Sequence, residues 1–157
     1  MVNTKIYKAV YILAEELLEA HNRQNQQAFD ALYAELQAIC IDNENTDKDH
    51  PVQWETLADF TEDLDEAIAI YDKALQKAVA MNTKDYMSSI AFSMAVLQVE
   101  LGHTDAAIQN LQQAKISANK IEDKALKNEI HDLLVSLLAD DSDAKQVLTQ
   151  TSMPTKE

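Results

Sequence analysis

The sequence predicts an all-α fold, and three observations support this class. Helix-forming residues recur throughout the 157-residue chain, whereas helix breakers are nearly absent, with one Gly and two Pro. Apolar residues return every three or four positions, which is the period of an amphipathic helix. A single glycine also cannot build glycine-rich phosphate loops or G-x-S-x-G elbows, and it argues against a β fold with many tight turns.

The sequence of the N-terminal part of the chain predicts two helices followed by a loop. Apolar residues define one face over residues 4–21, and the polar stretch 21–25 should turn the chain. The same periodicity resumes over residues 24–41. Residues 42–50 (DNENTDKDH) contain no apolar side chain and predict an acidic loop, after which Pro51 is a favourable first residue for a helix.

Residues 51–80 are compatible with two arrangements. The apolar positions keep their phase from Trp54 to Ala78, and no Gly or Pro interrupts the segment after Pro51. These features favour one continuous helix across the whole segment. The alternative is a short hairpin that turns near residues 60–63.

Three further helices are predicted in the second half of the chain, over residues 84–101, 105–118 and 120–139. Gly102 lies where a helix commonly ends in the left-handed conformation. The acidic run Asp140–Asp143 should break the last helix, leaving a short helical segment over residues 143–150. These elements predict a single domain over residues 1–150 and a flexible C-terminal tail over residues 151–157.

Three segments of the chain are similar to one another. Their aligned alanines lie 39 and 40 residues apart, at Ala28, Ala67 and Ala107. A large residue follows four positions after each alanine, at Leu32, Tyr71 and Leu111. Positions at this spacing share one helix face, where the small residue lets a neighbouring helix approach and the large residue fills the gap beside it. The repeat therefore predicts closely packed helix hairpins.

These repeats resemble the tetratricopeptide-repeat (TPR) family, whose repeats are helix hairpins of about 34 residues. The segment around Gly102 matches best, because Ala107 and Leu111 also fall on the family's signature positions. Gln98 stands where the family usually has an aromatic residue, and the middle segment is shorter than the family's repeat. The resemblance covers residues 9–120 and implies a right-handed stack of six or seven antiparallel helices.

The charge of the chain argues against two classes of partner. The chain contains 13 Lys and Arg but 27 Asp and Glu. The resulting formal charge of −14 repels nucleic acid and anionic membranes. Residues 42–66 hold ten acidic residues and one lysine, a concentration that would attract a basic partner. The acidic patch predicted there consists of Asp42, Glu44, Asp47, Asp49, Glu62 and Asp63.

The apolar segments of the chain predict the cellular location of the protein, because they are too short for a membrane helix or a signal peptide. No apolar stretch approaches the length of about 20 residues that a membrane helix needs. The apolar run near the N-terminus is too short for the core of a signal peptide. With a single cysteine, which suits a reducing compartment, these features predict a cytoplasmic protein.

No catalytic, cofactor or metal site is predicted, so we do not expect an enzyme. Glu100 and His103 have the spacing of a helical di-iron motif, but the chain has no second motif of this kind. The segment 42–53 lacks both the glycine and the final glutamate of a calcium loop. Cys40 lies near a predicted helix C-terminus, where the helix dipole raises a thiol pKa, so we expect a structural role for it.

The TPR resemblance implies an adaptor or chaperone that holds a protein segment in a groove lined by the first helix of each hairpin. The groove residues that it implies here are Ser89, Phe92, Val96, Val99 and Glu100 of the best-matched hairpin and Val10, Leu13 and Leu17 of the first. Most of them are apolar, so the groove would suit an apolar or amphipathic segment with a basic flank; the alternative is that they belong to the core. Two other functions stay open, a type III secretion translocator chaperone and a self-associating homodimeric scaffold.

Overall fold

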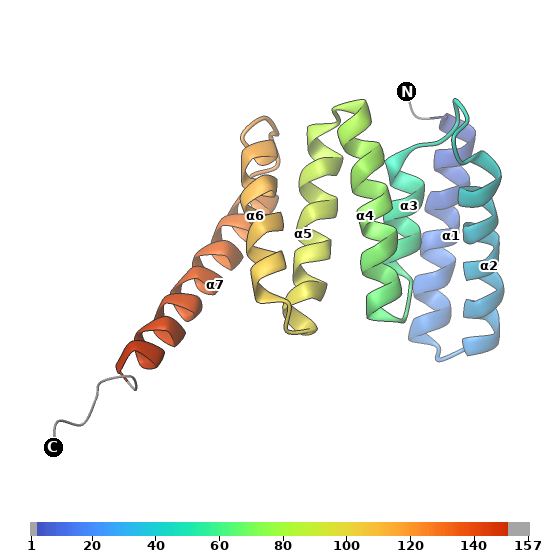
Figure 1. Cartoon of the computed structure of the whole chain (residues 1–157). Helices are drawn as coiled ribbons and strands as arrows, with labels where there is room; N and C mark the ends of the chain where they lie inside the picture. Colours follow the sequence, from blue (N-terminus) through green and yellow to red (C-terminus); the bar gives the residue numbers. More distant parts are fainter. Residues whose placement is uncertain (1–2, 151–157) are drawn as a thin grey trace, which may run out of the picture.

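The structure is a computed structural model that describes the backbone of residues 3–150 and the side chains of residues 3–141. Within this part every regular element is an α-helix, which confirms the all-α class. Figure 1 shows the seven helices: α1 (Thr4–Asn22), α2 (Gln26–Asn43), α3 (Pro51–Asp59), α4 (Leu64–Met81), α5 (Lys84–Glu100), α6 (Thr104–Ala118) and α7 (Lys124–Gln150). The tail predicted over residues 151–157 lies outside the described residues.

The helices form a row in which each helix packs beside the next and neighbours run antiparallel (Figure 1). The odd-numbered helices also contact one another, because α1 touches α3, α3 touches α5, and α5 touches α7. The even-numbered helices make no contacts of this kind within the described part of the chain. One surface of the row is therefore made by α1, α3, α5 and α7, and we call it the odd-helix face.

The prediction of one continuous helix over residues 51–80 is wrong. Asp63 begins α4 by accepting a hydrogen bond from the Glu66 amide at 2.9 Å. The hydroxyl of Thr61 donates to the Leu57 carbonyl at 2.8 Å and satisfies the end of α3. Because capping groups act on the free backbone groups at helix ends, they stop a helix even where the apolar periodicity continues. The alternative, a hairpin, is confirmed.

The predicted break at Asp140–Asp143 is also wrong, since α7 is one helix as far as Gln150. This helix begins at Lys124, later than predicted, because Asp123 Oδ1 caps it by accepting from the Leu126 amide at 3.0 Å. The boundaries predicted for α1, α2, α5 and α6 agree with the structure to within two residues. The acidic loop is correspondingly shorter than predicted, because α2 extends through Asn43.

Among residues 3–141, the buried apolar side chains form two core clusters. The larger cluster is formed by α1 to α5 and includes Leu17, Leu36 and Leu57, and the smaller one, which includes Leu111, is formed by α5 to α7. The alanines of the second and third repeats are buried between the helices, as their spacing predicts: Ala67, Ala74, Ala107 and Ala114. Small side chains at these positions let the hairpins approach closely.

Gly102 lies just beyond α5, where the sequence predicts a helix end. Its φ of +79° is in the left-handed region, and its amide donates to the Val99 carbonyl at 3.0 Å. Asn82 ends α4 in the same region of backbone space, with a φ of +53°. The two helix ends therefore use the same conformation with different residues.

Replacing Gly102 with Ala should lower the free energy of unfolding by about 1 kcal/mol, because an L side chain is strained at this φ. No atom lies within 4 Å of an added Cβ, so the cost comes from the backbone alone. Asn82→Gly relieves the same strain at the end of α4 and should produce a smaller change of opposite sign. Urea unfolding followed by circular dichroism measures both. An unaltered midpoint for Gly102→Ala would contradict the strained conformation.

Candidate functional site

Helix α5 presents a stripe of side chains on the side opposite its buried residues. The stripe has four members at spacings of three and four: Ser89, Ser93, Val96 and Glu100. Val96 is 41% exposed, and Glu100 is also exposed. Phe92 and Val99 lie beside the stripe, partly buried against the smaller core cluster. The structure therefore keeps three of the five residues predicted on this helix together on one surface, with the other two at its edge.

Helix α1 contributes other residues than those predicted. The three residues assigned to a groove lie in the larger core cluster, with exposures of 2%, 6% and 0%: Val10, Leu13 and Leu17. Their assignment to a groove is wrong, because their apolar stripe packs inward. Tyr7 and Tyr11 on the flank of this stripe are 44% and 57% exposed. Burial raises the pKa of the Tyr86 phenol of α5, and the nearby Tyr7 adds to this shift, so the Tyr7 flank of α1 lies near α5 on the odd-helix face.

A group of polar side chains lies where α3, α4 and α5 meet, and we call it the polar cluster: Glu55, Asp59, Tyr71, Ser89 and Ser93. The hydroxyl of Ser89 donates to Glu55 Oε2 at 2.8 Å. The hydroxyl of Tyr71 donates to Asp59 Oδ1 and also interacts with Ser93. Glu55 and Asp59 are one helical turn apart, so their carboxyl groups lie on the same side of α3.

The carboxyl group of Glu55 lies in an unfavourable environment for a negative charge. Burial and, to a smaller extent, the nearby charge of Asp59 raise its pKa to about 7, although the hydrogen bond from Ser89 acts in the opposite direction. Among residues 3–141, none of the salt bridges includes Glu55 or Asp59. A cation placed beside Glu55 would favour its ionised form and remove this penalty.

The polar cluster has the chemistry of a receptor for a basic side chain. Its two carboxyl groups offer acceptor oxygens one helical turn apart, and Ser89 and Tyr71 already hold one oxygen of each. The remaining oxygens can accept hydrogen bonds from an ammonium or guanidinium group, and such charge-assisted bonds are among the stronger ones in proteins. The sequence alone did not identify Glu55 and Asp59 as a site.

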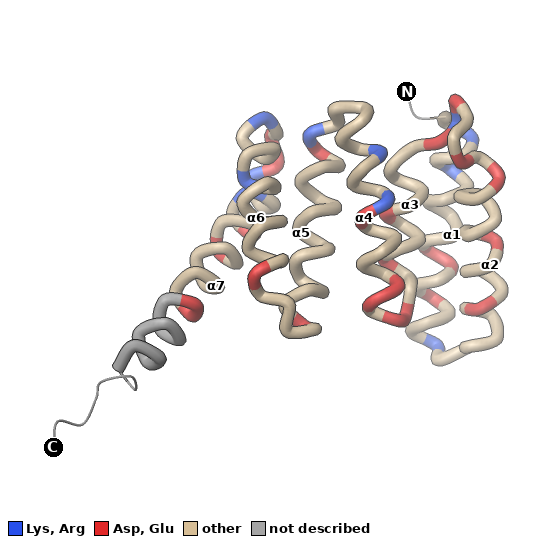
Figure 2. Tube along the Cα trace, viewed as in Figure 1, with Lys and Arg blue, Asp and Glu red and all other residues tan. Residues whose placement is uncertain are grey.

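The predicted acidic patch does not form one surface. Glu62 and Asp63 lie in the turn between α3 and α4, where Glu62 Oε1 accepts from Gln26 Nε2 at the N-terminal end of α2. The other four residues lie at the opposite end of α2: Asp42, Glu44, Asp47 and Asp49. Because α2 has 18 residues, its two ends are about 27 Å apart. Figure 2 shows acidic residues at both ends of this part of the molecule.

Two lysines of α4 already neutralise the loop that follows α2. Asp49 Oδ2 accepts from Lys77 Nζ at 2.7 Å, and Glu44 Oε2 pairs with Lys73 Nζ at 2.6 Å. Trp54 Nε1 donates to Asp49 Oδ1 at 2.8 Å, and Lys73 Nζ lies 4.3 Å from the centroid of the Trp54 ring. We call these five residues the loop latch, because they attach the loop to α3 and α4. Two of the predicted patch residues are therefore engaged in holding the fold.

Cys40 occupies a position that suits packing and not nucleophilic chemistry. Its thiol is fully buried and donates to the Gln53 carbonyl at 3.3 Å. Burial, with smaller contributions from Asp49 and Glu44, raises the pKa of the thiol to about 12. Since the thiolate is the reactive form, this environment suppresses the reactivity of Cys40 near neutral pH.

Among the His, Cys, Asp and Glu side chains of the described part of the chain, no three gather closely enough to hold a metal ion. None of its helices combines the length and the apolar character needed to cross a membrane. Comparison with protein-family models, curated proteins and solved structures finds no match to this chain. The polar cluster on the odd-helix face combines two neighbouring carboxyl groups with hydroxyl donors.

Proposed function

We propose that the chain is a TPR-like adaptor or chaperone that holds a segment of a partner protein along the odd-helix face. A Lys or Arg of the segment would pair with Glu55 and Asp59, and its apolar side chains would contact Tyr11 and Val96. One observation carries the proposal: two carboxyl groups lie side by side on this face, and their partners among the described residues are hydroxyl groups. The net charge of −14 would attract a segment of opposite charge.

The contacts between helices support a TPR-like arrangement. The pairs α1–α2, α3–α4 and α5–α6 can be described as three hairpins, followed by α7 as a final helix. The first helix of each hairpin contacts the first helix of the next, whereas the second helices stay apart in the described chain. Because the first helices lie closer together than the second helices, the row should curve toward the side formed by the first helices. The odd-helix face would then be the concave side, as in the family that the repeats resemble.

Site-specific photo-crosslinking tests this proposal. A photoreactive amino acid at the position of Tyr11 or Val96 should crosslink the partner in a lysate of the native host. The same group at Ile116, a residue of α6 that is 63% exposed, serves as the control on an even-numbered helix. We expect crosslinks from the first two positions and not from the control.

Charge reversal at Glu55 provides the second arm of this experiment. Glu55→Lys should reduce crosslinking by about tenfold or more, because it places a cation where the proposed ion pair forms. Glu35→Lys makes the same change at an exposed position of α2, an even-numbered helix, and should leave crosslinking unaltered. Circular dichroism verifies that both variants are folded. Equal crosslinking from Ile116, or equal yields from the two charge reversals, would contradict the proposal.

A further inference from the structure

A cavity of about 210 Å³ lies between α2 and the turn that joins α3 to α4. Three aromatic side chains line it, Phe29 and Tyr33 from α2 and Phe60 from the turn. The rings of Phe29 and Phe60 meet edge to face, with centroids 6.4 Å apart. The hydroxyl of Tyr33 bonds to that of Thr61 at 2.8 Å, which holds the third ring in place. The aromatic walls are therefore ordered before any ligand enters.

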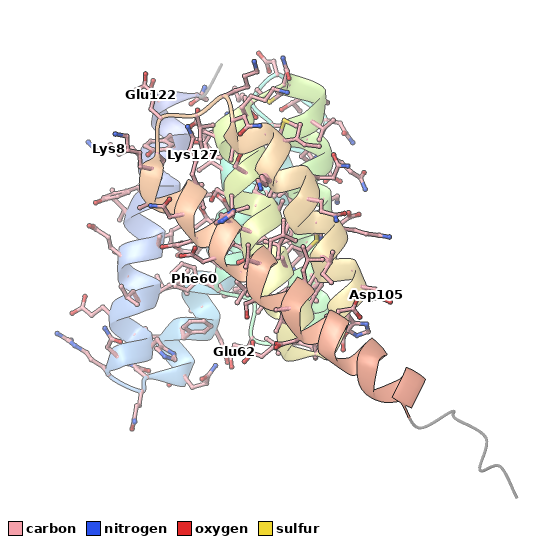
Figure 3. All side chains as sticks on the ribbon, turned by 90° about the vertical axis from the view of Figure 1, so that its left-hand side faces the viewer. Lys8, Phe60, Glu62, Asp105, Glu122 and Lys127 are labelled. Atoms are coloured by element: carbon pink, nitrogen blue, oxygen red, sulfur yellow. The ribbon has the colours of Figure 1, made fainter. Side chains whose placement is uncertain are left out.

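Carboxylates surround the same cavity. Asp30 of α2, Glu62 of the turn and Glu66 of the first turn of α4 all line it. Gln26 Nε2 donates to Asp30 Oδ1 and to Glu62 Oε1, at 2.8 Å in each case, and so holds these two carboxylates near each other. None of the salt bridges formed by residues 3–141 involves these acids. Figure 3 shows Phe60 and Glu62 at the same end of the molecule.

Aromatic walls together with carboxylates favour one class of ligand. Ring faces attract a cation within about 6 Å of the ring centroid, and alkylated ammonium groups are bound by aromatic cages in this way. A neutral apolar ligand would leave the carboxylates without a counter-charge. A cavity below the usual range of about 300–1,000 Å³ for small-molecule sites suits the end of a side chain or a small amine.

We propose that this cavity binds an alkylammonium group, supplied either by a lysine side chain or by a free amine. The site is separate from the polar cluster, because the cavity lies on the α2 side of the hairpin whereas the polar cluster faces α5. Binding in this cavity is therefore independent of the function proposed for the odd-helix face.

Titration of the ¹⁵N-labelled protein by NMR tests this site directly. The probes are N-acetyl-lysine methylamide, its trimethylammonium derivative and spermidine, each compared with sodium chloride at equal ionic strength. N-acetyl-norleucine methylamide, a neutral analogue of the lysine probe, reports any contribution from apolar filling alone. We expect saturable shift changes over residues 29–33 and 60–66 with a dissociation constant of about 1 mM for at least one cationic probe.

Two conservative variants separate the contributions of the ring and the charge. Phe60→Leu removes the ring but keeps an apolar side chain, and Glu62→Gln removes the charge but keeps an acceptor for Gln26. Each should weaken binding about threefold, as expected for one cation–π contact or one partly solvated charge. Glu122→Gln is the matched control, because Glu122 is exposed at the other end of the molecule (Figure 3). It should leave the affinity unchanged.

The outcomes of the titration are distinct. Tighter binding of the lysine probes than of spermidine identifies a lysine side chain as the source, and the reverse order identifies a free polyamine. Both results support the cavity as an alkylammonium site. Equal binding of the norleucine analogue, shift changes spread over all acidic surfaces, an absence of saturable shifts, or full affinity in both Phe60→Leu and Glu62→Gln would overturn the proposal.

Discussion

Replacing Glu55 with Gln should raise the free energy of unfolding by up to about 3 kcal/mol near pH 8 and leave it unchanged near pH 4. In the folded protein the pKa of the Glu55 carboxyl is raised to about 7, from an ordinary value of 4.5, chiefly by burial. As the pH rises between these values, the unfolded chain loses a proton that the folded chain still holds. The wild-type protein therefore loses stability over this interval, and Gln avoids the loss because it carries no ionisable proton.

Urea unfolding at a series of pH values measures this difference. Removing any carboxylate from a chain of charge −14 relieves some general repulsion, so Glu129→Gln, at an exposed position of α7, is the control. The stabilisation by Glu55→Gln should grow between about pH 4.5 and pH 7 and then stay constant. A difference that does not vary with pH, or that matches the control, would contradict the buried position of this carboxyl group.

The same pH dependence connects Glu55 to the proposed partner. A lysine or arginine beside Glu55 would lower its pKa, so binding would displace the proton that the free protein holds below about pH 7. The affinity for a basic segment should therefore rise with pH up to this value. If Glu55 has only a structural role, the pH dependence of stability should be observed, but the affinity for a basic segment should not change with pH.

The sequence predicted where most of the helices lie, but it missed the turn between α3 and α4 and both ends of α7. Apolar periodicity reports which side of a helix is buried, and it continued in phase from Trp54 to Ala78. The helix nevertheless ends within this interval, because Thr61 and Asp63 satisfy free backbone groups through single hydrogen bonds. At Asp140–Asp143 the prediction failed in the opposite direction, because α7 continues through this acidic run as far as Gln150. The apolar pattern therefore predicted the helices well, whereas the effect of local hydrogen bonds and charges on the helix ends was harder to predict.

The structure keeps three of the five groove residues predicted on α5 together on one surface, whereas it buries the three predicted on α1 in the core. The residues predicted on α5 come from the segment around Gly102, which resembles the TPR repeat better than the other two segments do. The first repeat matches the family's pattern less well, and the groove residue predicted there at Leu17 is fully buried. The sequence places Glu55 only within an acidic stretch, because its hydrogen bond with Ser89 depends on α5 packing beside α3.

Replacing Asp49 with Ala should lower the free energy of unfolding by about 3 kcal/mol at neutral pH, because it removes one partner of a largely buried ion pair. The side chains of Asp49 and Lys77 are only 9% and 17% exposed. The change leaves Lys77 with Glu44 at 3.9 Å and deprives the buried Trp54 Nε1 of its acceptor. Asp47→Ala removes an exposed acid from the same loop and should cost less than about 0.5 kcal/mol.

The effect of Asp49 should depend on pH in the direction opposite to that of Glu55. Burial alone would raise the pKa of Asp49, but the hydrogen bonds it accepts, led by that from Lys77, outweigh burial and hold the pKa below its ordinary value of 3.8. The stabilisation is therefore complete above this value and is lost as the pH falls through the lower pKa of the folded state. Urea unfolding near pH 7 and near pH 3 should show the difference between wild type and Asp49→Ala shrinking in acid. A difference that persists in acid would mean that packing of the loop, and not the ionised carboxylate, holds it to α4.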